Sequence, residues 1–204
     1  MVPNEFLECN FPLRIEHYVT LPDTGGPGRH RGGNALRISY GFLEDGEISI
    51  HDDRWLTYPW GVNGGLPGTR SKKILVRADG SEELMDSKRD RIKVYAGDVL
   101  HFDTWGGGGW GKPYERDPAA VAKDVDRGLV TREGARRYGV VMRDRESFDA
   151  AATEKLRAEM AAADVHRDAI FNRGGTIEEL KARCLAETGL EPPAPPVFQL
   201  RKSA

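Results

Sequence analysis

Four consecutive glycines, Gly106–Gly109, lie between Trp105 and Trp110. The chain contains 24 glycines in 204 residues, and many of them stand in short clusters. Ordering a glycine costs more backbone entropy than ordering any other residue. We therefore interpret the run as backbone that needs positive φ, close approach of another segment, or N–H groups turned toward a partner. This requirement constrains the fold more than any other feature of the sequence.

The same segment nearly matches a phosphate-binding loop. Gly106, Gly111 and Lys112 fit the pattern G-x-x-x-x-G-K, but Pro113 stands where the motif needs Ser or Thr. Proline supplies neither the hydroxyl that ligates Mg²⁺ nor an N–H, and it biases Lys112 toward extended backbone. We interpret the segment as a structural turn between a strand and a helix, or as a loop shaped for a subunit contact or a substrate.

Length and composition favour one domain with a real core, or one domain with an appendage. The net charge of −2 gives no basic field for nucleic acid, and no apolar run approaches the ~20 residues that span a bilayer. The N-terminus lacks the pattern of a signal peptide. The two cysteines, Cys9 and Cys184, form no disulfide framework or zinc pattern. We expect a cytoplasmic protein that binds neither nucleic acid nor membrane.

The first half of the chain predicts strands. Apolar residues recur at alternate positions around residues 13–19, 36–42, 48–50, 74–76 and 92–94, with Gly- and Asp-rich turns between them. Six or seven short strands with no intervening helix predict a β-rich sandwich or barrel-like part over about residues 11–105.

The second half predicts helices. Asp117 can cap a helix with Pro118 at its first position and Gly128 after its end. Thr131 can cap a second short helix that ends near Gly139. The class is therefore α+β.

Two longer helices follow. Ser147 can cap the first, and Thr176 with Glu179 forms a capping box for the second, which stops at Gly189. The prolines of 191–196 predict an extended tail or docking arm over the last ~12 residues. We place the domain boundary at residue 142, with a β-rich domain over 1–142 and a helical extension over 143–204.

Candidate catalytic residues are few. His51 and Asp53 could point the same way from a strand end, and His101 and Asp103 share one face of a strand beside the glycine run. A strand end and a hydrogen-bonded structural pair are the alternative interpretations. The five histidines show no metal-ligand spacing, and we assign no metal site.

Two charged turns complete the candidates. Arg29 and Arg31 lie among glycines and could form an anion-binding nest, with solvated turn charges as the alternative. Glu115 and Asp117 favour a helix start over an acid/base pair, because carboxylates stabilise helix N-termini. The residues alone therefore indicate an unusual glycine architecture without a complete catalytic constellation.

Read in order, the glycine motifs resemble the C-terminal part of hydantoinase B proteins, which are related to the alpha subunit of acetone carboxylase and to the B half of 5-oxoprolinase. The similarity covers roughly residues 11–162. The matching motifs are Pro12–Glu16, Asp23–Gly28, Arg31–Gly33, Asp53–Arg54, Pro59–Gly61, Gly64–Gly68, Ser87–Lys88, Ala96–Val99, Trp105–Gly111, Glu115–Pro118, Asp124–Val125, Gly128–Val130 and Tyr138–Val141.

The resemblance implies an ATP-dependent assembly. A hydantoinase A-type subunit would bind ATP and phosphorylate a carbonyl oxygen, and the B-type subunit would hydrolyse or carboxylate the activated group. The resemblance implies that the partner subunits bind ATP with Mg²⁺ and a divalent metal. We expect this chain to bind no cofactor itself.

Family B subunits are usually more than twice this length, and their metal ligands resemble residues of the N-terminal half. Two interpretations fit: a small subunit accessory to a larger B-type subunit, or a binding module that reuses the fold. In the first, the Gly106, Gly107, Gly108 and Gly109 loop and the turn at Arg29 and Arg31 would face the partner or its active site. A self-sufficient hydrolase using His51, Asp53, His101 and Asp103 is a third hypothesis.

Overall fold

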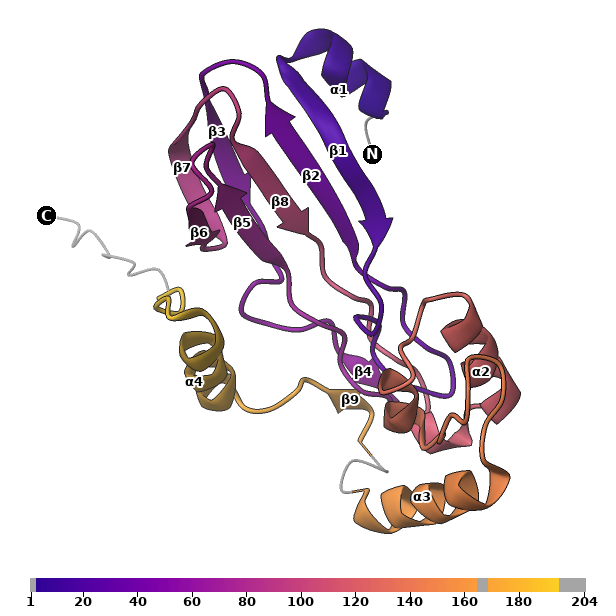
Figure 1. Cartoon of the computed structure of the whole chain (residues 1–204). Helices are drawn as coiled ribbons and strands as arrows, with labels where there is room; N and C mark the ends of the chain where they lie inside the picture. The colour runs from indigo at the N-terminus through magenta and orange to yellow at the C-terminus, as the bar shows by residue number, and fades with distance from the viewer. Residues whose placement is uncertain (1–2, 165–168, 195–204) are drawn as a thin grey trace, which may run out of the picture.

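The computed structural model describes residues 3–164 and 169–194. It is elongated, with the strands of a large sheet at one end, glycine-rich extended segments in the middle, and α2 and α3 at the other end (Figure 1). The strands are β1 (Leu13–Thr20), β2 (Leu36–Phe42), β3 (Gly46–His51), β4 (Gly61–Val62), β5 (Lys72–Val76), β6 (Glu82–Met85), β7 (Lys88–Val94), β8 (Val99–Asp103) and β9 (Phe171–Asn172). The helices are α1 (Asn4–Asn10), the 3₁₀ turns η1 (Pro113–Glu115) and η2 (Gly134–Tyr138), and α2 (Pro118–Asp126), α3 (Ala150–Ala163) and α4 (Ile177–Thr188).

The strands form antiparallel sheets, which confirms the α+β class. The large sheet has the order β1-β2-β8-β5-β6, while β3 pairs with β7 and β4 pairs with β9. Within the described strands the sheets stay open and no barrel closes. The alternation predicted for β1 is interrupted by a register shift between Ile15 and His17, because a bulge inserts one residue without a partner.

One hydrophobic core lies between the large sheet and the β3–β7 pair. The two sheets contribute residues to a single buried cluster, as their alternating pattern predicts. The members are Phe42, Ile50, Leu75, Met85, Ile92, Val94 and Leu100. A second cluster is built on α2 and the segment after it, and its members are Val121, Ala122, Val125, Val130, Ala135, Tyr138, Val140 and Met142.

A buried charge pair lies beside the first core. Lys73 occupies an inward position of β5, and its Nζ donates to the carboxylate of Asp52, which also accepts from the hydroxyl of Ser71. Both charged side chains are fully buried. Burial lowers the pKa of Lys73, although the nearby Asp52 opposes the shift. Removing either partner would leave an uncompensated charge in the interior.

The Gly106–Gly109 run is the centre of a bundle of extended glycine-rich segments, which we call the glycine bundle (residues 24–34, 59–69 and 105–111). Its backbone bonds join segments far apart in sequence, and no side chain separates them. These bonds are Gly26 N to Gly107 O at 2.8 Å, Gly107 N to Gly33 O at 2.8 Å, Val62 N to Gly109 O at 2.9 Å, Gly109 N to Leu66 O at 2.9 Å, Leu66 N to Pro27 O at 2.8 Å and Gly106 N to Thr69 O at 3.3 Å.

Close approach explains Gly106, Gly108 and Gly109, whereas a Cβ on Gly107 would lie 3.1 Å from its nearest neighbour, Gly33 N. A Cβ on Gly106 would lie 1.8 Å from the carbonyl oxygen of Thr24, and one on Gly108 would lie 1.8 Å from the carbonyl oxygen of Trp60. None of the four glycines of the run has a positive φ. Of the three explanations considered for the run, the requirement for close backbone approach therefore accounts for it.

The helix boundaries around α2 follow the sequence signals. The Asp117 carboxylate accepts from the N–H of Ala119, and Pro118 takes the first helical position. Lys112 is extended with ψ of 131°, as its proline neighbour requires. Gly128 and Gly139 follow α2 and η2 with φ of 70° and 68°.

The two longer helices agree in part with what the sequence predicts. Thr176 and Glu179 form the predicted capping box, and Leu180 and Cys184 are buried. Ile177, in the first turn of the same helix, is exposed. The residues 195–204 of the predicted tail lie outside the described part of the chain.

The cap predicted for the first long helix is wrong. Asp149, rather than Ser147, caps α3, because the Ser147 hydroxyl donates to Asp144 at 2.5 Å in the preceding turn. The domain boundary at residue 142 stays a prediction. Polar contacts cross it, including one from Val141 N to the Thr153 hydroxyl at 3.1 Å.

The bundle predicts a sharp contrast between two glycines. In Gly108→Ala the new methyl would meet the Trp60 carbonyl, and we expect the free energy of unfolding to fall by about 2 kcal/mol or more. In Gly33→Ala the methyl meets nothing within 4 Å, so a change within about 1 kcal/mol is expected. Urea unfolding of both variants checks this. Equal effects would show that the glycines are not there for close packing.

Candidate functional site

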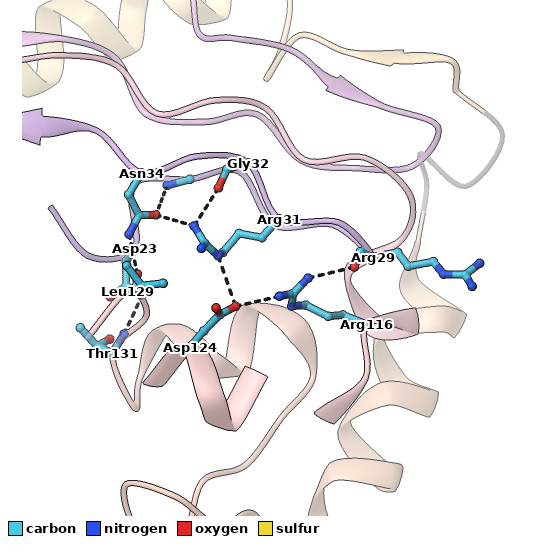
Figure 2. Close-up of polar contacts among 10 residues, drawn as sticks. Asp23, Arg29, Arg31, Gly32, Asn34, Arg116, Asp124, Leu129 and Thr131 are labelled. Atoms are coloured by element: carbon cyan, nitrogen blue, oxygen red, sulfur yellow. Dashed lines mark hydrogen bonds and ion pairs between the residues drawn. The ribbon is translucent and has the colours of Figure 1, made fainter. Parts of the chain in front are cut away.

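A carboxylate shared by two arginines joins the glycine bundle to α2 (Figure 2). The Oδ2 of Asp124 accepts from Arg31 Nε at 3.2 Å and from Arg116 Nη2 at 2.9 Å. Arg116 also donates to the carbonyl oxygen of Arg29 at 3.1 Å. The three charged side chains are only 12–16% exposed, so their ion pairs are poorly screened by water.

The network extends through an asparagine to the glycine turns. Arg31 Nη1 donates to the carbonyl oxygen of Gly32 at 2.8 Å and to Asn34 Oδ1 at 3.0 Å. The Asn34 amide in turn donates to the Leu129 carbonyl at 2.7 Å, and its oxygen accepts from Gly25 N at 3.1 Å. These contacts fix the orientation of the glycine-rich turn relative to the segment after α2.

The structure separates the two arginines of the predicted contact turn. Arg31 points inward into the network, so it is not a solvated turn charge. The side chain of Arg29 extends away from the network in Figure 2, while its backbone bonds to Gly111 and Arg116. Of this turn, Arg29 is therefore the residue whose charged group is directed away from the protein's own ion pairs.

The glycine loop uses its backbone donors internally. The N–H groups of Gly106, Gly107 and Gly109 all donate to carbonyls of the same chain. Gly107 and Gly108 are half-buried, whereas Trp105 and Trp110 at the two ends are exposed. A contact role for the four glycines stays a prediction, and such a contact would involve the flanking indoles more readily than the loop N–H groups.

Aromatic side chains gather on one side of the bundle, and we call this the aromatic face (His30, Trp60, Trp110, Phe171 and Arg173). Val62 pairs with Phe171 and with Trp110, and Trp110 pairs with His30, so these side chains point the same way. The Trp60 and Phe171 rings are 5.7 Å apart, and the His30 and Trp110 rings are 5.4 Å apart.

The face is both exposed and charged. Trp60 is 42%, Trp110 46% and Phe171 53% exposed, and the Arg173 guanidinium lies 4.5 Å above the Trp60 ring. Sequence reasoning missed it, because Phe171 comes from β9 and reaches the bundle only through a long-range pairing. The available signal was the apolar alternation of Trp60 and Val62 around a glycine.

The structure does not bring His51 and Asp53 together as a ligand pair. His51 Nε2 lies 3.1 Å from Asp90, and Asp53 lies 3.6 Å from Lys88, with all four side chains largely exposed. Among the described residues no three His, Cys, Asp or Glu side chains are grouped to hold a metal ion. The catalytic role considered for His51 and Asp53 stays a prediction.

The side chains of His101 and Asp103 are paired with side chains of the neighbouring strand β2. His101 Nδ1 lies 2.8 Å from the Ser39 hydroxyl, and Asp103 accepts from Arg37 at 2.6 and 2.8 Å. Burial and then the positive charge of Arg37 lower the pKa of His101. The pairs bond across adjacent strands, and a catalytic role for either residue remains untested.

The order of glycine motifs and this fold have counterparts among known proteins. The family model described as hydantoinase B/oxoprolinase matches residues 1–113. The chain belongs to this family. An uncharacterised family relative from Methanocaldococcus jannaschii is 36% identical over 76% of this chain, and caprolactamase subunit beta of Pseudomonas jessenii is 31% identical over 76%.

Two solved structures share the fold of this family member. The ATP-dependent caprolactamase from Pseudomonas jessenii aligns over 76% of this chain with a TM-score of 0.64 and 30% identity. Acetone carboxylase, in a nucleotide-free structure, aligns over 90% with a TM-score of 0.66 at 20% identity, which shows the fold alone. The matched region is 28% and 27% of the two relatives' lengths and 28% of each solved chain, so this chain spans little more than a quarter of the proteins it matches.

The shared carboxylate predicts a stability contrast along α2. Asp124→Asn would leave two mostly buried guanidinium groups without a counter-charge, and we expect a loss of about 3 kcal/mol in the free energy of unfolding. Asp126→Asn on the same helix removes a half-exposed pair with Arg145 at 3.7 Å, and should cost less than about 1 kcal/mol. Thermal and urea unfolding check both. A similar loss in the two variants would contradict a special role for Asp124.

The lowered pKa of His101 predicts a pH dependence with a definite sign. Below its ordinary pKa of about 6.5 the unfolded chain binds the proton more readily than the folded chain. Stability should therefore fall as the pH is lowered from about 6.5 toward the folded pKa, and His101→Gln should flatten that part of the profile. Unfolding free energies measured across this range test it. A His101 ring resonance that titrates above the ordinary value would overturn the prediction.

No helix of the described chain has the length and hydrophobicity needed to cross a bilayer.

Proposed function

We propose that this chain is a small subunit of an ATP-dependent complex of the hydantoinase or carboxylase type, accessory to a larger B-type subunit in the cytoplasm. Its match to caprolactamase subunit beta, 31% identical over 76% of this chain, supports membership in a complex of this kind. The reaction would be cyclic amide hydrolysis or ketone carboxylation after phosphoryl activation.

The other functions of the complex belong to its partners in this proposal. A hydantoinase A-type subunit would bind ATP with Mg²⁺, and the divalent metal would also be held outside this chain. Phosphorylation turns a carbonyl oxygen into a better leaving group, which is the contribution of ATP to amide opening. The present chain would support the site through its rigid bundle, because its glycine segments are locked to one another by backbone bonds.

The aromatic face is the surface we propose for the larger B-type subunit. Tryptophan and arginine are enriched among the residues that dominate binding energy, especially where aromatic groups become fully desolvated. Trp60, Trp110 and Phe171 are each 42–53% exposed, so a partner can still remove much of their surface from water. Arg29 and Arg173 favour a partner that places carboxylates near the indoles.

A non-enzymatic assembly module is the alternative. The observation in its favour is that the polar candidates His101, Asp103 and Arg31 already have partners within the chain. A module of this kind would bind a partner without contributing to ATP-dependent turnover. Reconstitution of activity with and without the chain distinguishes the two hypotheses.

Co-purification tests the proposed partner and its surface together. The tagged full-length chain, expressed in its native source, should retain A-type and larger B-type subunits that mass spectrometry identifies. Trp60→Ser combined with Phe171→Ser should weaken this association at least about tenfold, because two aromatic anchors are lost. Tyr95→Ser is the matched control: Tyr95 is 51% exposed, but it lies in the turn before β8, at the opposite end of the sheet from the bundle.

The results of this experiment test the proposed subunit function and the proposed contact surface separately. A wild-type chain that retains neither subunit, or is active alone as a stable monomer, would overturn the proposed function. A wild-type chain that retains them equally well after the double substitution would refute the aromatic face and leave the function standing. A comparable loss in Tyr95→Ser would point to general damage to the fold.

A further inference from the structure

We propose that an apolar groove beside β3 binds an extended segment of the larger B-type subunit, which adds to β3 as a further strand. The identity of this partner rests on the proposed function. The groove lies between β3 on one side and β1, β2 and β8 on the other, and its main cavity has a volume of about 320 Å³. A second cavity of about 140 Å³ continues it at the start of β3 and shares Leu13, Phe42 and Ile48 with the first.

The β3–β7 pair covers only part of one face of the large sheet, on the side of β5 and β6 (Figure 1). Residues directly opposite each other in antiparallel strands share a face. Leu13 of β1 pairs with the core residue Phe42, and Ile15 pairs with Tyr40, which packs against the same core. Both β1 residues are only half-buried. The apolar face of the sheet therefore continues beyond the strands that cover it.

The backbone of β3 offers hydrogen bonds toward this groove. Just after the strand, Asp52 N donates to Ser87 O on the β7 side at 2.9 Å. The N–H groups of successive strand residues point to opposite edges. Those of Glu47, Ser49 and His51 therefore point to the other edge, with which no strand of the described chain pairs. Such an edge is a template for the addition of another strand.

The edge of β1, by contrast, is protected against strand addition. The Glu8 carboxylate of α1 accepts from Ile15 N at 2.8 Å, and the register shift between Ile15 and His17 interrupts the ladder. Helices and bulges are devices by which proteins block sheet edges. Beside β3, every residue that lines the main cavity belongs to a strand, so no helix covers that groove.

The lining of the groove indicates the chemistry of the segment. Strand addition combines main-chain hydrogen bonds with pockets for alternate side chains. Tyr40 and Ile48 present partly buried apolar surface, so alternate residues of the segment would be apolar. Glu44 and Asp45 line the smaller cavity, and neither forms an ion pair with another residue of the described chain. A lysine or arginine at this end of the segment would complement the acidic margin.

A second copy of this chain does not fit the groove. Its β3 would bring its own large sheet into the layer that β1 and β2 already occupy. The relatives indicate a different source, because the solved caprolactamase shares this fold over only 28% of its chain. In the proposed function, the larger B-type subunit supplies the counterpart of the remaining polypeptide. An extended segment of that subunit is therefore the occupant we assign.

Photo-cross-linking in the native source tests this occupant. The tagged full-length chain carries p-benzoylphenylalanine in place of Ser49, an exposed residue that lines the groove, and the cells are irradiated before lysis. We expect an adduct with a segment of the larger B-type subunit that has apolar residues at alternate positions. The same group in place of Tyr95 is the control and should give no adduct, because Tyr95 is 51% exposed but lies beside Arg77 of β5 and its neighbouring turn.

The products of irradiation decide between the possible occupants. Absence of the adduct at position 49, in a complex that retains the B-type subunit, would refute the groove and leave the proposed function standing. An adduct with a second copy, with residues 195–204 of the same chain or with any other protein would also overturn the assignment. A chain that retains neither the A-type nor the B-type subunit would instead overturn the proposed function, and the partner assigned to the groove with it.

A proline at the free edge of β3 gives an independent test. Ser49→Pro removes one N–H that an added strand would need but no bond to β7, and proline is tolerated on an edge strand at such a position. Ser49→Ala is the matched control, because both variants lose the hydroxyl and only the first loses the N–H. In co-purification, Ser49→Pro should weaken retention of the B-type subunit several-fold, and Ser49→Ala should not. Equal retention would contradict strand addition, and the cross-linking result decides if Ser49→Pro fails to fold.

Discussion

Backbone packing without side chains is the constraint on which the rest of this structure depends. At Gly106 and Gly108 the neighbouring carbonyl oxygens occupy the space that a Cβ would need. Each extended segment can therefore hydrogen-bond to more than one neighbouring segment. The Gly106–Gly109 run bonds to both of the other segments of the bundle, residues 24–34 and 59–69. The entropy cost of ordering so many glycines is met by a dense set of backbone bonds, which also determines where the flanking tryptophans lie.

The bundle needs the Arg31–Asp124–Arg116 network to join it to the helical part. A hydrogen-bonded glycine segment offers no side chain to pack against a helix, so attachment falls to the few polar residues among the glycines. Arg31 and Asn34 meet this need from one side and Asp124 from the other. This explains why Arg31 is mostly buried although it lies in a glycine-rich turn, where charged residues are usually solvated.

Local signals in the sequence predicted local structure well. Two helix starts are defined by contacts within one turn, those at Asp117 with Pro118 and at Thr176 with Glu179. Because the residues of each cap are neighbours in the sequence, the sequence alone is enough to predict it. The cap of α3 failed because Ser147 has a competing carboxylate three residues away, and propensity alone does not choose between Ser147 and Asp149.

Features that depend on tertiary partners could not be predicted in the same way. The inward Lys73 breaks the apolar pattern of β5, and only the fold reveals Asp52 beside it. The sequence identified the glycine run as unusual but did not tell which segments would meet it. Likewise, His101 and Asp103 were recognised as sharing a face, whereas their partners Ser39 and Arg37 depend on the pairing of β2 with β8.

The bundle also separates architecture from chemical selectivity. The N–H groups of Gly106, Gly107 and Gly109 donate hydrogen bonds to carbonyls of the same chain. The glycine motifs therefore cannot distinguish one substrate from another through those donors. The same fold can therefore recur in an ATP-dependent caprolactamase and in an acetone carboxylase, whose reactions differ. Any selectivity contributed by this chain must come from side chains at the margin of the bundle. There the exposed indoles of Trp60 and Trp110 are able to gain contacts with a partner or a ligand.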